Sequence, residues 1–282
     1  DRTKAMDTTI NAHFTNPDLV KAMIRLADKL LPNGGSALEI GCGSGTFIRE
    51  SDPDKWKFTG IEIDPTTAKI AEILCPESTQ IINLPIEDTE LEDSSFDLVI
   101  GNVPFASYAP YDKVYNPLGA PLHDYCLMRG IHALKDGGIM AVITSRYTLD
   151  KKNSEYREWF ASQADLLFAY RLPDDTHKDF AGTSAITDLL VFRKKDASSN
   201  RVPKLDPEKW KKTFTVKLSK DQSNSKRYSY NNDTFAVECN NIYQNFDNVL
   251  ASIYQDIIPS YSNKGDGHKL RVCNYIYRRY SE

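Results

Sequence analysis

The sequence predicts an α/β fold built on a doubly wound, mainly parallel sheet. Short apolar segments recur through residues 1–195, and most are separated by stretches long enough for a helix. A glycine-rich turn follows the first of these segments, and acidic or amide residues come directly after several later ones. This alternation is typical of sheets that bind ligands at the carboxyl ends of their strands.

An amphipathic helix is predicted first, over residues 17–31. Its apolar residues recur at spacings of three and four, Asn16-Pro17 is a start signal, and Asn33-Gly34-Gly35 ends it. The strands that follow are predicted over residues 36–40, 58–63, 79–83, 96–101, 138–144, 165–171 and 188–193. The last two, joined through Phe180 and Gly182, are expected to form an antiparallel edge. The whole arrangement is Rossmann-like.

Length and composition fit one large domain with an appendage. Of the 282 residues, 40% are hydrophobic and 26% are charged, as in ordinary globular proteins. We predict a domain over residues 1–195 and an appendage over residues 196–282, where the sequence becomes polar and rich in turn residues. No apolar run could span a bilayer, and the first residues lack the layout of a secretory signal. A cytoplasmic location without a membrane partner is therefore expected, and the widely spaced cysteines agree with a reducing compartment.

The net charge of −4 argues against a protein that coats nucleic acid nonspecifically, because neutralising phosphates requires clustered Lys and Arg. Any DNA affinity would have to be local or supplied by another chain. Basic and aromatic residues between Lys269 and Tyr280 leave two explanations open: contacts with phosphates, or the edge of a truncated domain.

The glycine-rich turn after the first strand indicates a cofactor site. Gly41 and Gly43 allow the backbone to approach a ligand closely, although a dinucleotide-binding loop or a plain strand-to-helix turn would look similar. Glu39 distinguishes between S-adenosylmethionine and NAD as the ligand, because a buried carboxylate needs a partner that compensates its charge. The positively charged methionine portion of S-adenosylmethionine would supply one, whereas the phosphates of NAD would be repelled. We therefore expect S-adenosylmethionine.

Acidic residues after the next two strands extend this expected site. Glu62, followed by Ile63, stands at the carboxyl end of the second strand, where it could accept hydrogen bonds from a ribose hydroxyl pair. Glu87 or Asp88, after the third strand, could meet the adenine of the cofactor. Either of these two could also be a plain solvated acid.

An Asn-x-Pro-aromatic motif, Asn102-Val103-Pro104-Phe105, ends the fourth predicted strand. The amino nitrogen of adenine is a poor nucleophile because its lone pair is delocalised into the ring. If the Asn102 side-chain oxygen and the Val103 carbonyl accepted its two hydrogens, a pyramidal nitrogen would be favoured. Pro104 fixes the loop, and Phe105 offers a face for an extruded base. Alignment and electrostatics suffice for this chemistry, so no metal is predicted.

These motifs resemble the class-gamma DNA N6-adenine methyltransferases, and more closely the methylase domains attached to helicase-like proteins of phages and mobile elements. The resemblance covers roughly residues 8–195 and is carried by Ile86–Thr89, Gly101–Phe105, Leu122–Tyr125, Gly137–Ile139 and Phe180–Ser184. It implies an S-adenosylmethionine-dependent methyltransferase fold and methylation of adenine in DNA, as in restriction-modification. It also implies that Phe14 and Thr15 cover the methionine end of the cofactor and Asn102 borders it, while Phe180 is a second aromatic residue around the flipped base.

The sequence departs from the family pattern in two places. Val103 replaces the first proline of the commoner motif, and Asn16 replaces the proline that usually follows Phe-Thr. Neither change removes a chemical group assigned above. The appendage is short for reading bases, so target recognition is expected to come from another chain or from missing sequence.

Several alternatives stay open at this stage. The acceptor could be an RNA adenine or a protein glutamine amide, or the chain could be a noncatalytic module of a larger DNA-processing assembly. Tyr108, Tyr111 and Tyr115 could stack on DNA or simply pack their loop; we assign Tyr108 to the substrate site. The histidines lack metal-ligand spacing. His123-Asp124 is expected to cap a helix over residues 125–134, with direct catalysis as the alternative.

Overall fold

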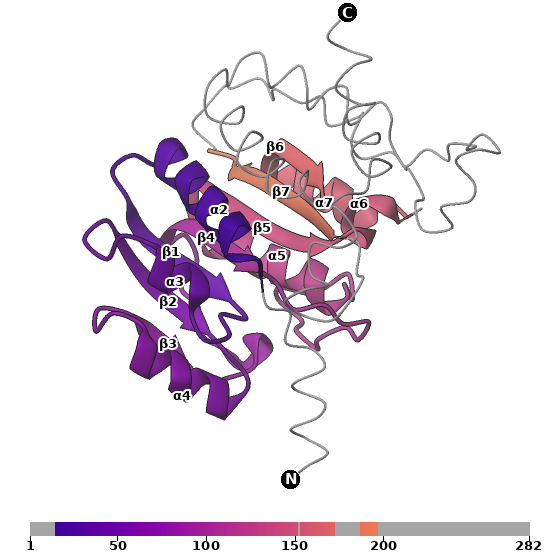
Figure 1. The fold of residues 1–282 in the computed structure, drawn as a ribbon. Coiled ribbons are helices and arrows are strands. Elements are labelled where there is room, and N and C mark those ends of the chain that lie inside the picture. The colour runs from indigo at the N-terminus through magenta and orange to yellow at the C-terminus, as the bar shows by residue number, and fades with distance from the viewer. Residues whose placement is uncertain (1–14, 152, 173–186, 197–282) are drawn as a thin grey trace, which may run out of the picture.

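The computed structural model describes residues 15–151, 153–172 and 187–196, and these contain one seven-stranded sheet. Its strands are β1 (Gly35–Ile40), β2 (Trp56–Ile61), β3 (Gln80–Ile82), β4 (Phe96–Asn102), β5 (Leu134–Ser145), β6 (Ala164–Arg171) and β7 (Thr187–Lys194). They are arranged in the order β3-β2-β1-β4-β5-β7-β6 (Figure 1). The strands from β1 to β5 pair in parallel, whereas β7 runs antiparallel to both β5 and β6. The predicted mainly parallel sheet with an antiparallel edge is confirmed.

Helices cover both faces of this sheet. They are α2 (Pro17–Leu30), α3 (Thr46–Glu50), α4 (Pro65–Leu74), the 3-10 helix η1 (Ile86–Asp88), α5 (Leu122–Ala133), α6 (Tyr147–Asp150) and α7 (Glu155–Gln163). One apolar cluster joins α2, α3 and α4 to one face of the sheet, and a second joins α5 and α7 to the other. Figure 1 shows α2 lying across the front of the sheet. The fold is therefore a three-layer sandwich, as the alternating sequence predicted.

Alternation along the central strands produces these two cores. In β4, Leu98 and Ile100 point to the α2 side, whereas Val99 between them points to the α5 side. Because successive side chains of a strand face opposite ways, an almost continuous apolar run fills both layers. The helix predicted over residues 17–31 is α2, and its N-cap residue Asn16 accepts a hydrogen bond from the Asp18 amide at 2.9 Å.

The prediction for the start of α5 is wrong. The helix begins at Leu122, directly after Pro121, so His123 and Asp124 lie within its first turn rather than capping it. Both side chains are buried, and the Asp124 carboxylate accepts a hydrogen bond from the Thr148 hydroxyl at 2.8 Å. A tertiary partner thus replaces the local capping interaction.

Residues 197–282 lie outside the described part of the chain, so the predicted boundary of the appendage stays a prediction. The same holds for Phe14, Phe180 and the basic segment between Lys269 and Tyr280. Within the described ranges, none of the helices combines the length and apolar character needed to cross a membrane.

Candidate functional site

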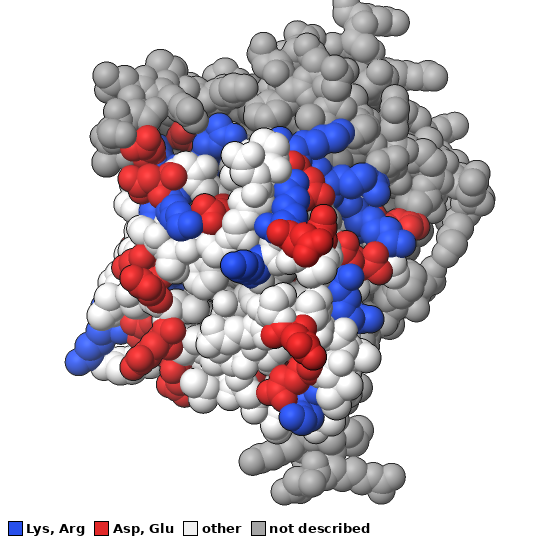
Figure 2. Space-filling view, turned by 90° about the vertical axis from the view of Figure 1, so that its left-hand side faces the viewer, with Lys and Arg blue, Asp and Glu red and all other residues white. Residues whose placement is uncertain are grey.

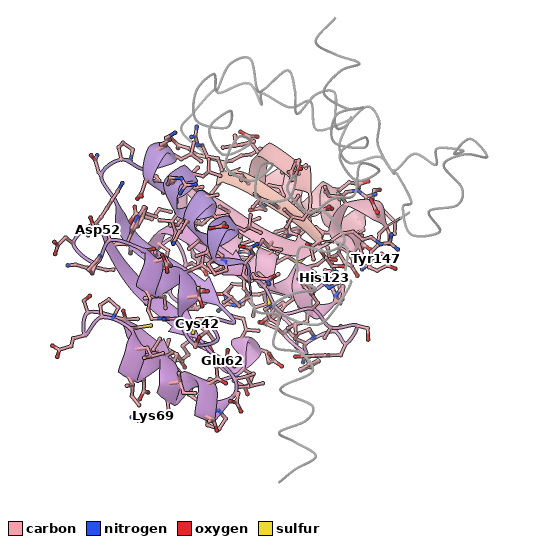
Figure 3. All side chains as sticks on the ribbon, in the orientation of Figure 1. Cys42, Asp52, Glu62, Lys69, His123 and Tyr147 are labelled. Atoms are coloured by element: carbon pink, nitrogen blue, oxygen red, sulfur yellow. The ribbon has the colours of Figure 1, made fainter. Side chains whose placement is uncertain are left out.

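The glycine turn after β1 is tied to the end of β2. The Gly41 and Cys42 amides both donate to the Ile61 carbonyl, at 2.8 and 2.9 Å. The Glu62 carboxylate then accepts from the Gly43 amide at 2.9 Å and from the Asp64 amide at 2.8 Å. Figure 3 shows Cys42 and Glu62 close together at this edge. The turn and the acid that follows the neighbouring strand therefore form one unit.

Positive φ angles at Gly41 (73°) and Gly43 (55°) explain why glycine occupies both positions. A Cβ atom on Gly41 would lie 3.0 Å from Pro104 Cδ, so the turn closely approaches the segment that follows β4. On Gly43, by contrast, a Cβ would meet no atom of the described residues within 4 Å. The turn thus packs against the Asn-x-Pro-Phe motif on one side and leaves room for a ligand at Gly43.

Glu39 is a buried carboxylate at the end of β1. Its side chain is only 2% exposed, and its Oε2 atom makes no hydrogen bond among the described residues. Burial, followed by the nearby charge of Glu62, raises its pKa well above the usual range, and Arg49 opposes this only partly. An uncompensated carboxylate in such a place is costly unless a ligand supplies a positive group.

The Asn-x-Pro-Phe motif extends the end of β4. The Val103 amide continues the ladder with β5 by donating to the Ile143 carbonyl at 3.1 Å, and the Val103 side chain is buried. Asn102 Nδ2 donates to the Thr15 hydroxyl at 3.2 Å, which ties the motif to the segment just before α2. Phe105 is half-buried and packs against both apolar clusters. The sheet therefore holds this segment in a fixed position.

A family model described as a methyltransferase domain matches residues 38–113. This range runs from β1 to the loop after β4 and contains the glycine turn, Glu62, Glu87 and the Asn-x-Pro-Phe motif. No curated protein matches the chain.

Solved structures with a similar fold include a putative class I S-adenosylmethionine-dependent methyltransferase from Listeria monocytogenes. Its TM-score is 0.55 and its sequence identity is 17%, and the match covers 67% of this chain and 64% of that one. The fold is that of the S-adenosylmethionine-dependent methyltransferases.

Two further structures with this methyltransferase fold are subunits of restriction-modification systems. One is a type I methyltransferase subunit from Streptococcus thermophilus, with a TM-score of 0.54, 24% identity, and coverage of 66% of this chain and 45% of that one. The other is a modification subunit of a putative type I restriction enzyme from Vibrio vulnificus, with a TM-score of 0.51, 18% identity, and coverage of 65% and 44%. The chain thus spans less than two thirds of the length of each of these three structures.

S-adenosylmethionine is the cofactor that this methyltransferase fold and the matching family model imply. Two features of the site fit it. Among the described residues, the space beside Gly43 is open, and Glu39 Oε2 makes no hydrogen bond, so this carboxylate offers a counter-charge for a positively charged methionine group. Ile63, 60% exposed just after Glu62, offers apolar surface at the same edge.

The structure distinguishes the two acids after β3. Glu87 is half-buried in η1, and its Oε2 atom is buried without a hydrogen-bond partner among the described residues, whereas Asp88 is exposed to solvent. Burial and then the charge of Glu87 raise the pKa of Tyr108, so these two side chains lie near each other. Of the two predicted candidates, Glu87 is the one with a buried carboxylate oxygen, and its place in the cofactor site stays a prediction.

The three tyrosines of the loop after β4 differ in environment. Tyr115 is packed, with its ring 5.0 Å from that of His132 and the Arg129 guanidinium 3.7 Å above its face. Tyr108 and Tyr111 are 50% and 81% exposed. For Tyr115 the packing interpretation is therefore the correct one.

Sequence reasoning missed Asn83 as a part of this site. Its side-chain amide donates to the main-chain carbonyls of Glu62 and Ile63, at 2.8 and 3.1 Å, and so holds the segment after β2 in place. An amide residue directly after a short strand was the available signal. Among the residues that the structure describes, no group of His, Cys, Asp or Glu side chains is arranged to hold a metal ion.

Proposed function

We propose that this protein transfers the methyl group of S-adenosylmethionine to the exocyclic amine of adenine in DNA. The observation that carries the proposal is the position of Asn102. Its amide ends β4, contacts Thr15, and belongs to a segment whose Pro104 approaches the Gly41 turn. An acceptor amine held by this amide would stand beside a cofactor bound at the glycine turn.

The residues of the motif act by holding the amine. The Asn102 side-chain oxygen and the Val103 carbonyl accept its two hydrogens, which localises the nitrogen lone pair. Phe105 and Tyr108 line the place of the extruded base, and Pro104 keeps the loop rigid. When bound, S-adenosylmethionine supplies a methyl group activated by its sulfonium. The chain contributes alignment and hydrogen bonding, for which no covalent intermediate is needed.

The cofactor-binding residues have separate tasks in this proposal. Glu39 pairs with the positively charged methionine end, and Phe14 and Thr15 cover that end. Gly41 and Gly43 pass close to the cofactor, Glu62 accepts from the ribose hydroxyls, and Ile63 packs beside the cofactor. Glu87 accepts from the adenine amine; Asp88 is the weaker candidate because it is exposed. Phe180 is proposed as the second aromatic residue at the base.

Two observations support DNA as the substrate. Structures of the same fold include methyltransferase subunits of type I restriction-modification systems, and the Asn-x-Pro-Phe motif suits a planar amine. Because the chain spans less than half the length of those two subunits, we propose that another chain or segment supplies target recognition.

The deciding experiment measures transfer of a labelled methyl group to DNA by the full chain, followed by mass spectrometry of the modified base. Asn102→Ala is expected to lower transfer at least a hundredfold, as the loss of one hydrogen-bonding group aimed at a transition state typically does. Asn33→Ala is the control. Asn33 is exposed in the turn before β1, at the end of the strands opposite to the one that carries Asn102.

Parallel reactions with RNA and with protein define the alternatives. Transfer to an RNA adenine or a glutamine amide, with none to DNA, would contradict the proposed substrate while leaving the chemistry intact. Calorimetry that detects no S-adenosylmethionine binding would instead indicate a noncatalytic module of a larger assembly.

A further inference from the structure

The loop that joins β4 to α5, residues 103–121, exposes apolar side chains in a concentrated group. Tyr108, Tyr111 and Val114 are 50%, 81% and 71% exposed and lie within seven residues of each other. Large apolar side chains gathered on one exposed loop indicate a surface that another molecule covers. We call Tyr111 and Val114, with Lys113 between them, the loop tip.

The base of this loop is held by a buried amide. Asn116 is 6% exposed; its Nδ2 donates to the carbonyls of Pro110 and Ala120, at 2.8 and 3.0 Å, and its Oδ1 accepts from the Ala120 amide at 2.7 Å. The Leu122 amide also donates to the Tyr108 carbonyl at 2.9 Å. These bonds close the loop on itself and on the start of α5.

A second set of contacts fixes the centre of the loop. Asp112 Oδ1 accepts from the Val114 and Tyr115 amides, both at 2.9 Å, and its Oδ2 accepts from the Tyr125 hydroxyl of α5 at 2.7 Å. Although partial burial works in the opposite direction, these hydrogen bonds hold the pKa of Asp112 below its usual range. Packing of Tyr115 under Arg129 completes the anchor. The tip is thus presented by an ordered scaffold, which reduces the entropy lost on binding.

The charge around the loop selects the kind of ligand. Asp112 and Lys113 are the only charged residues between Phe105 and Pro121, whereas residues 86–93 contain five acids and no base. The loop tip is mainly apolar, with Lys113 as its single base, and the Tyr115 hydroxyl beside it donates to Asp93 of the acidic segment at 3.2 Å. Such a surface is poorly suited to binding a row of phosphates. It suits the faces of nucleobases, to which aromatic and aliphatic side chains bind without charge.

We propose that the loop tip stacks on DNA bases beside the base held by Asn102, with Tyr111 and Val114 as the contacting side chains. This inference rests on the proposed DNA substrate. The tip would occupy space between bases and so stabilise the distorted DNA from which one base is extruded. Lys113, whose ammonium lies 5.9 Å from the centroid of the Tyr111 ring, helps to orient that ring.

Binding of the full chain to fluorescein-labelled mixed-sequence DNA, single-stranded and duplex, tests the proposal. Tyr111→Ala is expected to weaken binding about tenfold or more, in the range of base–aromatic stacking, and Tyr111→Phe to retain it. Because no phosphate contact is lost, the slope of log affinity against log salt concentration should not change. Ile73→Ser is the matched control, since Ile73 on α4 is 72% exposed and Val114 is 71% exposed. Val114→Ser is expected to weaken binding and Ile73→Ser to leave it unchanged.

The outcomes separate this inference from the proposed activity. Unchanged affinity in Tyr111→Ala and Val114→Ser, or a changed salt slope, would overturn base stacking even if the protein methylates DNA. Weakened binding in these variants without any methyl transfer by the wild type would support stacking and contradict the proposed reaction. A wild-type chain that binds no DNA would overturn both.

Discussion

The Glu39 side chain packs against Gly101 across the β1–β4 pair, where a Cβ atom on residue 101 would lie 3.1 Å from Glu39 Cγ. The glycine, with φ at 148°, leaves the space in which the carboxylate is buried. A carboxyl group is therefore kept out of water at the strand end, next to Gly101, which precedes Asn102. The cofactor-free protein bears the cost of this arrangement.

Glu39→Gln is expected to stabilise the cofactor-free protein at neutral pH and to weaken S-adenosylmethionine binding. Burial, then repulsion by Glu62, raises the folded-state pKa of Glu39 well above its usual range. The folded state thus binds this proton more tightly than the unfolded state, whose pKa is about 4.3, so the free energy of unfolding falls as pH rises above that value. Urea unfolding between pH 5 and 8 should show the advantage of the variant growing with pH. If the free energies of unfolding of the wild type and the variant changed with pH in the same way, this explanation would be contradicted.

Gly43→Ala and Gly137→Ala form a matched pair. Both glycines have positive φ angles, 55° and 76°, and in the part of the chain that the structure describes a Cβ on either would meet no atom within 4 Å. Each substitution should therefore cost a similar backbone strain, about 1–2 kcal/mol by urea unfolding. Only Gly43→Ala should reduce cofactor affinity in calorimetry, because only Gly43 borders the proposed cofactor site. Equal affinity in the two variants would remove Gly43 from that site.

Thr15→Val is expected to lower kcat while cofactor affinity changes little, because valine has nearly the same shape as the threonine proposed to cover the methionine end of the cofactor. The Thr15 hydroxyl accepts the 3.2 Å hydrogen bond from Asn102 Nδ2 and so helps to orient the catalytic amide. Loss of one such bond corresponds to about 1 kcal/mol, or roughly a fivefold lower rate. Thr15→Ser keeps the hydroxyl and should retain most of the activity in the methyl-transfer assay. A Val variant as fast as the wild type, or a Ser variant slower than the Val variant, would contradict the role assigned to the hydroxyl.

Tyr125→Phe should loosen the loop after β4. The variant removes the 2.7 Å hydrogen bond to Asp112, and the free energy of unfolding should fall by about 1 kcal/mol. The folded-state pKa of Asp112 is depressed, so its contribution to stability is present above the unfolded value of about 3.9 and is lost as pH falls through the folded value. The wild type should therefore lose more stability than Tyr125→Phe in acid. Tyr156→Phe, which removes only an exposed 3.4 Å contact with the Gly119 carbonyl, serves as the control.

The sequence was sufficient to predict the strands, because each buried strand of a parallel sheet is an apolar run with an identifiable end. It did not reveal that β7 lies between β5 and β6, since strand order depends on pairing between distant segments. The start of α5 was misplaced for a related reason. Aspartate is a residue type that often caps helices, but the Asp124 carboxylate instead accepts a hydrogen bond from Thr148, 24 residues later.

In the candidate site, the sequence motifs predicted which residues take part but not which of them contact each other. Asn102 and Thr15 were both predicted, yet the hydrogen bond between them spans 87 positions and follows only from the fold. Tyr111 and Tyr115 could not be separated by pattern, because the difference depends on Arg129 and His132 of α5, which cover only Tyr115. Glu87 and Asp88 are neighbours in sequence, and only the geometry of η1 shows which one turns inward.

The anchors of the loop after β4 lie in its base and centre, at Asn116, Asp112 and Tyr115, whereas the Tyr111, Lys113 and Val114 side chains project into solvent. Figure 2 shows the side of the molecule that lies on the left in Figure 1, where acidic and basic side chains are interspersed with uncharged ones. The residues that fold the loop are therefore different from the residues that its surface exposes. The exposed side chains can be substituted without disturbing the hydrogen bonds that hold the loop. Substitutions at these three positions should therefore change what the loop contacts while leaving the buried scaffold intact.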